Sequence, residues 1–376
     1  MALLAVFSRE LSNVNLLTMS AGIAVIFLFS LIFVFFFRTI ARKIGLVDKP
    51  NYRKRHHGFV PLAGGISVYA GLCFTSLITS VPIPHFGLYL ACSGLLVFVG
   101  ILDDRFDISV KIRALVQAIV GVVMMMFADL YLQTPGYIFG HAKIYFGQFG
   151  YVVTLFAVWA SINAFNMVDG IDGLLGGLSC IAFGALGILF WLSEHFALAF
   201  WCFAIIASIT PYILLNLGFF GLRYKVFMGD AGSTLLGFTA IWLLLESSQG
   251  SDPAIKPVTA LWVIAIPLMD MISIMYRRLR KGISPFSPDR QHIHHLIMHA
   301  GCTPHQALLL ITFAAAILAA VGIVGERLSF VPEWVMLVLF LLAFFLYGRC
   351  LKQAWRVAHC LRRQTEPSAK KNKHKF

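Results

Sequence analysis

The sequence predicts an all-α polytopic membrane protein, and its composition and its long apolar runs carry that prediction. Of the 376 residues, 59% are apolar even without glycine, whereas soluble globular chains reach roughly 45–50% with glycine included. Charged residues make up only 12%, about half of the usual share of roughly 25%. Side chains this apolar are accommodated only in lipid, which excludes a soluble enzyme, a disordered chain and a fibrous repeat.

Spanning helices are predicted wherever about 20 consecutive residues are mainly apolar. Eleven segments meet this expectation: residues 16–37, 62–80, 85–102, 110–128, 150–168, 174–192, 197–217, 232–247, 257–276, 306–325 and 333–350. The segments 85–102 and 232–247 are short, but omitting either would move every later loop to the other side of the membrane. The first segment is too long for a cleavable signal, and no small-residue cleavage site follows it.

Lysine and arginine test this arrangement because they concentrate on the cytoplasmic side. With the N-terminus periplasmic and the C-terminus cytoplasmic, 26 of the 30 lie in inner segments. The outer ones are Arg9, Lys143, Lys256 and Arg327. The net charge of +13, which in a soluble protein would suggest nucleic acid, therefore indicates membrane anchoring and no nucleic-acid partner. We expect one integral-membrane domain over residues 1–351 and a basic cytoplasmic tail over 352–376.

Six of the 17 acidic residues gather in three inner loops, at the ends of predicted spans. The first loop holds Asp103, Asp104 and Asp107, and Asp107 would share a face with either of the others on a continuing helix. Like charges this close repel one another, so the cluster favours a cation, and oxygen-rich sites suit Mg²⁺ or Mn²⁺ together with substrate phosphates. The alternative is a solvated loop whose acids pair with the basic residues between Arg105 and Arg113.

The second loop carries polar residues at every third position, namely Asn163, Asn166, Asp169 and Asp172. On a continuing helix they would form one polar stripe, and polar groups at membrane depth are costly and usually line a site. The glycine after each acid would let backbone or ligand come close. Hydrogen bonding between helices is the alternative, which explains Asn163 but not two acids as well.

The third loop, Val226-Phe-Met-Gly-Asp-Ala-Gly-Ser233, opens a predicted span. Its small residues, Gly229 among them, allow a tight turn, and the N–H groups of the following helix suit an anion. Asp230 is placed to hold a metal that the same anion binds. The alternative is that Asp230 caps the helix and needs no ligand.

Two polar, mainly basic loops on the same side add donors for a diphosphate. Their candidate substrate-binding residues are Lys49, Asn51, Arg53 and His56 in the first loop and Arg290, His292, His294 and His295 in the last. Zinc is the alternative for the histidines, but no cysteine lies nearby and the usual two ligand pairs are missing. Basic loops, carboxylates and Mg²⁺ on one face are what phosphoryl transfer requires, and the apolar spans would admit a membrane substrate.

A secondary transporter is the alternative from another class, and transporters carry binding acids near the bilayer midplane, often with inverted repeats. Outside the motifs, the acids within predicted spans are Asp270, toward an inner end, and Glu246, at an outer end. No internal repeat is visible. The enzyme is therefore the favoured interpretation.

In these motifs the chain resembles the polyprenyl-phosphate N-acetylhexosamine-1-phosphate transferases. The matching stretches are Asp48-Lys-Pro-Asn51, Asp103-Asp104, Asn166-Met-Val-Asp-Gly-Ile-Asp-Gly173, Phe227-Met-Gly-Asp-Ala-Gly232 and His292-Ile-His-His295. The resemblance implies an enzyme of the bacterial inner membrane that transfers GlcNAc-1-phosphate from UDP-GlcNAc to undecaprenyl phosphate and releases UMP. Such a step would initiate lipid-linked glycans such as O-antigen and enterobacterial common antigen. Another donor, such as UDP-GalNAc or UDP-MurNAc-pentapeptide, is the alternative, and a homodimer is compatible with either.

The resemblance also implies roles for individual residues. It assigns Mg²⁺, or Mn²⁺ in its place, to Asp230 with Asn166 as a second ligand. It assigns catalytic roles to Asp103 and Asp104, and nucleotide or catalytic contacts to Asp169 and Asp172. It links the histidine loop to the diphosphate and the sugar. We expect a single displacement in which a lipid-phosphate oxygen attacks the sugar-side phosphorus, and a covalent aspartyl-phosphate is the rival mechanism.

Overall fold

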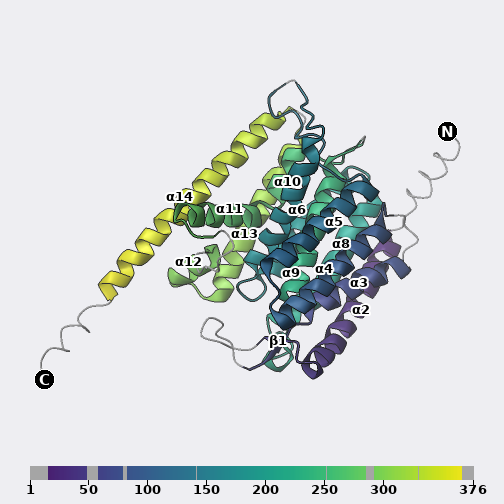
Figure 1. The fold of residues 1–376 in the computed structure, drawn as a ribbon, viewed down its shortest axis with the longest axis vertical. Helices are drawn as coiled ribbons and strands as arrows, with labels where there is room; N and C mark the ends of the chain where they lie inside the picture. The colour runs from purple at the N-terminus through teal and green to yellow at the C-terminus, as the bar shows by residue number, and fades with distance from the viewer. Residues whose placement is uncertain are drawn as a thin grey trace, which may run out of the picture.

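The computed structural model describes residues 16–48, 58–78, 83–140, 142–250, 252–284, 292–328 and 330–365. This part of the chain is mainly helical (Figure 1). The helices are α2 (Leu16–Lys43), α3 (Gly64–Ile78), α4 (Phe86–Phe106), α5 (Val110–Ala128), α6 (Phe149–Val168), α7 (Leu174–Leu192), α8 (Phe196–Asn216), α9 (Gly229–Ser248), α10 (Pro257–Val263), α11 (Ala265–Arg280), α12 (Ile293–His299), α13 (Pro304–Arg327) and α14 (Glu333–Thr365). The other elements are the antiparallel pair β1 (Val47–Asp48) and β2 (Val60–Pro61) and the 3₁₀ turn η1 (Leu222–Tyr224).

The apolar helices confirm a polytopic membrane protein. Eight of the described helices are long and apolar enough to cross a membrane, and the bent pair α10–α11 makes a ninth if it counts as one span. The shorter helix α3 is apolar over its 15 residues. Each of the eleven predicted segments contains helix, because long apolar runs in lipid must satisfy their backbone hydrogen bonds internally.

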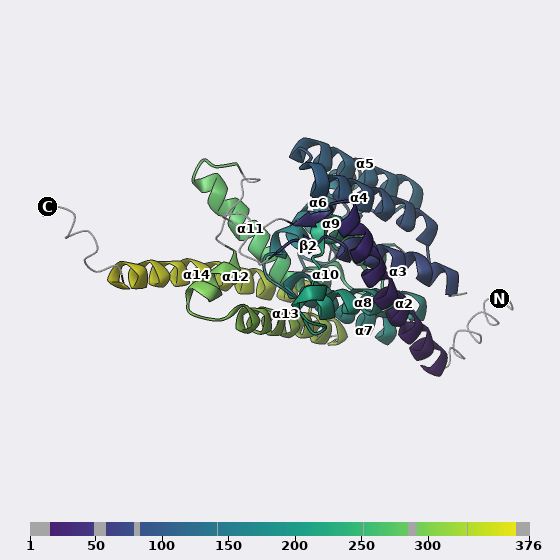
Figure 2. The same cartoon turned by 90° about the horizontal axis from the view of Figure 1, so that it is seen from below.

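The predicted span over residues 257–276 is broken, which corrects the expectation of one continuous helix. α10 ends at Val263, α11 begins at Ala265, and the two are bent by 82°. Pro267 explains the break, because its nitrogen cannot donate to the carbonyl of Val263 and its ring crowds that carbonyl. Figure 2 shows that α11 and the end of α14 extend away from the main bundle on the same side.

α9 is the central helix and is buried around most of its circumference. It packs against α3, α4, α6 and α7. Two glycines allow its first turn to be approached closely. A Cβ on Gly65 would lie 2.3 Å from the backbone nitrogen of Gly232, and a Cβ on Gly100 would lie 2.3 Å from the Cα of Ala231. The bundle therefore converges on the start of α9, where Asp230 lies.

α14 forms an outer edge of the molecule (Figure 1). It runs as one helix from Glu333 to Thr365 and so passes through residue 352, where the basic tail is predicted to begin. The division into a membrane domain and a tail stays a prediction.

Candidate active site

The first pair of acids lies in the last turn of α4. Asp103 is 6% exposed and Asp104 is half-buried. The helix ends at Phe106, and Asp107 adopts a left-handed backbone with φ of 52° and is exposed. The shared helical face expected for Asp107 with the other two acids is therefore not formed. The backbone turns away before Asp107 can join them.

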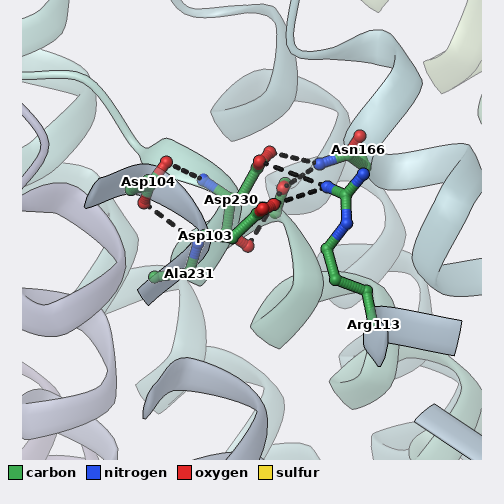
Figure 3. A network of polar contacts seen from close by, with 7 residues as sticks. Asp103, Asp104, Arg113, Asn166, Asp230 and Ala231 are labelled. Atoms are coloured by element: carbon green, nitrogen blue, oxygen red, sulfur yellow. Dashed lines mark hydrogen bonds and ion pairs between the residues drawn. The ribbon is translucent and has the colours of Figure 1, made fainter. Parts of the chain in front are cut away.

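Asp104 ties the end of α4 to the start of α9. Its Oδ1 accepts the N–H of Asp230 over 2.9 Å, and its Oδ2 accepts the N–H of Ala231 over 3.4 Å (Figure 3). Gly229, with φ of 74°, leaves room for this contact, because a Cβ there would lie 2.4 Å from Asp104 Oδ2. A carboxylate from another helix thus satisfies amides that a helix start leaves unpaired. Asp230 itself lies inside the first turn, so the alternative in which it caps the helix is wrong.

Four helix ends supply the polar centre of the site. Arg113 of α5 places Nη1 2.5 Å from Asp103 Oδ2 and 3.5 Å from Asp230 Oδ2. Asn166 of α6 donates its Nδ2 to Asp230 Oδ1 over 2.7 Å and to Ser233 Oγ over 2.9 Å (Figure 3). The pairing of loop acids with Arg113 was the predicted alternative for this cluster. It is present, but it joins acids from two different helices.

The donor set is compatible with Mg²⁺. Within the described residues, no group of three or more His, Cys, Asp or Glu side chains is arranged to hold a metal by itself. Mg²⁺ is usually held by one or two carboxylates together with substrate phosphates. The buried Oδ1 of Asp103 has no hydrogen-bond partner in the part of the chain that the structure describes. Arg113 already brings positive charge between Asp103 and Asp230. The residues therefore fit an ion that is shared with a phosphate ligand.

The second loop differs from the predicted stripe. α6 ends at Val168, so Asp169 and Asp172 lie in the turn before α7 and not on the same helix as the two asparagines. Asn163 donates within α6, to the carbonyl four residues earlier, over 2.8 Å. Of the four residues predicted to form the polar stripe, Asn166 is the one that contacts Asp230.

The turn after α6 is anchored by residues that the sequence analysis did not single out. Asp172 Oδ2 lies 2.5 Å from Lys225 Nζ. The buried Asn216 accepts the N–H of Gly173 over 2.6 Å and donates to the carbonyl of Val226 over 2.9 Å. A lone asparagine at the end of a predicted span was the available signal. Through it, the turn of the second loop is joined to the segment that leads into α9.

The histidines lie around the start of α12. His292 precedes the helix with extended backbone, so it does not share a helical face with His295. His294 is 1% exposed, and neither of its ring nitrogens has a hydrogen-bond partner among the described residues. Burial, reinforced by the neighbouring histidines, lowers the pKa of His294 to about 3. His294 is therefore neutral near pH 7.

α12 packs onto the turn of the second loop. A Cβ on Gly170 would lie 2.2 Å from His294 Nε2, so this ring rests against bare backbone. The ring of His292 stacks on that of His294 with centroids 5.5 Å apart. The structure thus unites the histidine and aspartate motifs. The predicted ligands that lie outside the described residues are Lys49, Asn51, Arg53, His56 and Arg290.

The fold and the site together define an integral membrane protein whose helix ends form an acidic site suited to Mg²⁺ and phosphate. The profile of glycosyl transferase family 4 matches residues 86–248, which run from α4 to α9. The Yersinia pestis protein named undecaprenyl-phosphate alpha-N-acetylglucosaminyl 1-phosphate transferase is 70% identical over 362 residues, which cover 96% of this chain and 99% of that protein.

Two further relatives carry the same name. The protein from Escherichia coli (strain K12) is 68% identical, over 93% of this chain and 95% of its own length. The protein from Haemophilus influenzae is 51% identical, over 91% of this chain and 96% of its own length. The chain belongs to glycosyl transferase family 4.

Proposed function

We propose that the protein transfers GlcNAc-1-phosphate from UDP-GlcNAc to undecaprenyl phosphate and releases UMP, as the first step of O-antigen or enterobacterial common antigen synthesis. The observation that carries the proposal is the junction of Asp103, Asp230 and Asn166, in which Arg113 contacts both carboxylates and Asn166 donates to Asp230. It gathers motif residues from three separate loops. The relatives named for this transfer match the chain over more than nine-tenths of its length.

The proposed cofactor is Mg²⁺, with Mn²⁺ as a substitute. Asp230 and Asn166 are the proposed ligands, and the free Oδ1 of Asp103 is available beside them. When bound, the ion would neutralise charge on the diphosphate and on the departing UMP. Arg113 adds positive charge at the same place, because its guanidinium contacts both carboxylates.

The proposed reaction is a single displacement. A lipid-phosphate oxygen forms a bond to the sugar-side phosphorus of UDP-GlcNAc, while the bond from that phosphorus to the bridging oxygen breaks and UMP leaves with the electron pair. Asp103 is the group we assign to accept a proton from the lipid phosphate. The second pKa of a phosphate monoester is about 6, so this transfer contributes modestly and charge neutralisation dominates.

The remaining acids receive different assignments. The catalytic role implied for Asp104 stays a prediction, and its two amide hydrogen bonds support a positioning role toward Asp230. Asp172, paired with Lys225, and Asp169 in the same turn are proposed to contact the nucleotide. The histidines of the α12 region and Asn163 are proposed to bind the sugar diphosphate.

The proposed topology has eleven spans, a periplasmic N-terminus and a cytoplasmic C-terminus in the bacterial inner membrane. It counts α10–α11 as one broken span and includes α3 and α9. The distribution of 26 of the 30 lysines and arginines on the inner side supports it. A reporter fused after Phe376 should therefore read cytoplasmic, and a periplasmic reading would exclude this topology. The homodimer stays a prediction.

One assay tests the function. Purified protein is incubated with undecaprenyl phosphate, Mg²⁺ and one UDP-sugar at a time, and UMP is measured. UMP should appear with UDP-GlcNAc, and its absence there would refute the proposal. Release with UDP-GalNAc or UDP-MurNAc-pentapeptide alone would change the donor. A sugar-phosphorylated enzyme formed without undecaprenyl phosphate would favour the covalent mechanism.

A further inference from the structure

Asp270 of α11 is a fully buried carboxylate that the proposed mechanism does not use. Its Oδ1 accepts the hydroxyl of Tyr347 over 2.8 Å and the N–H of Ile293 over 3.2 Å. Its Oδ2 lies 2.9 Å from Nδ1 of His292. A buried charge is costly unless it is paired and hydrogen-bonded, and here partners from the α12 region and α14 meet that requirement.

The hydrogen-bond pattern determines which nitrogen of His292 carries a proton. The amide of Ile293 can only donate, and an ionised carboxylate can only accept. With Asp270 ionised, Nδ1 of His292 must therefore donate. Nε2 is then the ring atom not committed to Asp270. When both ring nitrogens carry a proton, His292 and Asp270 form an ion pair, and the Nε2–H can donate to a phosphate oxygen of a ligand.

The same contacts set the location of α12. Ile293 is its first residue, so the hydrogen bond to Asp270 attaches the start of the helix to α11. On the other side, the ring of His294 stacks on His292 and rests against Gly170 in the aspartate turn. The histidine rings are thus held between a buried carboxylate and the backbone of the second loop.

We propose that Asp270 and Tyr347 are positioning residues for the sugar-phosphate transfer, holding His292 so that its Nε2 faces the diphosphate of the nucleotide sugar. This inference rests on the proposed function. A carboxylate behind a functional histidine fixes the tautomer and the ring orientation, and its loss typically costs about 10–100-fold where such pairs have been measured at metal sites. Tyr347 acts one step further away, by orienting Asp270.

The kinetic test uses the full chain with Asp270→Asn and Tyr347→Phe. The asparagine has no negative charge to pair with a protonated His292. Its NH₂ group faces either the donors Tyr347 and Ile293 or Nδ1 of His292, which must then accept. We expect kcat/KM for UDP-GlcNAc to fall about 10–100-fold, mainly through a higher KM for UDP-GlcNAc with an unchanged KM for undecaprenyl phosphate. Tyr347→Phe removes one of three donors and should cost about 3–10-fold. Glu246→Gln, at a half-buried acid in another predicted span, is the control and should leave both KM values unchanged.

Hydrogen exchange of residues 292–299 gives a second readout that needs no activity. Asp270→Asn should accelerate exchange there, because the N–H of Ile293 loses a charged acceptor and meets either a neutral carbonyl oxygen or an NH₂ group. A wild-type protein that protects α12 but releases no UMP would refute the proposed function and leave the Asp270 contacts standing. Wild-type kinetics in Asp270→Asn would overturn the inference. So would a lowered kcat with both KM values unchanged, which is the signature of a smaller folded fraction.

Discussion

Gly170→Ala tests how the site is assembled, because this glycine is where the aspartate turn meets the histidine helix. Gly170 does not have a left-handed backbone, so alanine suits its conformation. The new Cβ would nevertheless lie 2.2 Å from His294 Nε2 and 2.3 Å from its Cε1. Ordinary contacts between such atoms are about 3.5–4.0 Å long. The ring is 1% exposed and cannot step aside, so α12 must move.

The cost follows from the packing of the ring. Overfilling a closely packed interior typically costs about 1–3 kcal/mol, which changes an equilibrium about 5–150-fold. The equilibrium affected is the docking of α12, a helix of seven residues, and not the folding of the bundle. We therefore expect kcat/KM for UDP-GlcNAc to fall by about 5–150-fold with little change in melting temperature.

The assay combines UMP release with hydrogen exchange of α12. Gly184→Ala in α7 is the matched control, because its Cβ would meet Ile206 Cδ1 at an ordinary 3.8 Å. Adding His294→Ala to Gly170→Ala should restore the protection of α12, since the clashing ring is gone. If Gly170→Ala kept wild-type activity and exchange, the contact between the two motifs would not matter for the site.

Three further predictions concern charge. The pKa of His294 is about 3, against about 6.5 for a free histidine. The buried, neutral ring therefore stabilises the docking of α12 fully above about pH 6.5. This stabilisation weakens by about 1.4 kcal/mol per pH unit as the pH falls toward 3. Exchange of α12, corrected for its intrinsic rate, should therefore accelerate near pH 5, and unchanged protection there would contradict the burial argument. Asp230→Asn should lower Mg²⁺-dependent UMP release about 100-fold or more, because metal ligation contributes several kcal/mol. Asp107→Asn, at an exposed acid, is the control and should keep its activity. Full activity in Asp230→Asn would exclude the ligand role. Arg113→Ala should lower the melting temperature in a chelator, with Mg²⁺ recovering part of the loss, and a shift insensitive to Mg²⁺ would argue against an ion shared by Asp103 and Asp230.

The helices of this fold could be predicted from run length alone, because a chain in lipid has few ways to satisfy its backbone. The bend at α10–α11 could not, since hydropathy records how apolar a stretch is and not where its hydrogen bonds stop. Pro267 was a visible signal for it. The pairing of β1 with β2 involves two residues in each strand and leaves no periodic pattern.

Membership of the site was easier to predict than its geometry. Spacing identified Asp103, Asp104 and Asp230, because acids are rare in this chain and these lie at span ends. Asp104 meets amides because of how the end of α4 approaches α9, and Asp103 meets Arg113 because of how it approaches α5; no local pattern encodes either approach. Asn216 was missed for the same reason, because its two partners lie in different loops.

Asp270 shows how a residue can change its meaning between sequence and structure. In the sequence it was one of two acids within predicted spans outside the motifs, and its place toward a span end gave a transporter little support. A transport acid must exchange partners with its cargo, whereas Asp270 is fully buried and accepts from Tyr347, Ile293 and His292 together. The bend before α11 makes this possible, because a helix that leaves the bundle can contact α14 and the start of α12 at once (Figure 2). The broken span is thus the feature that lets a residue in the membrane domain hold a histidine at the site.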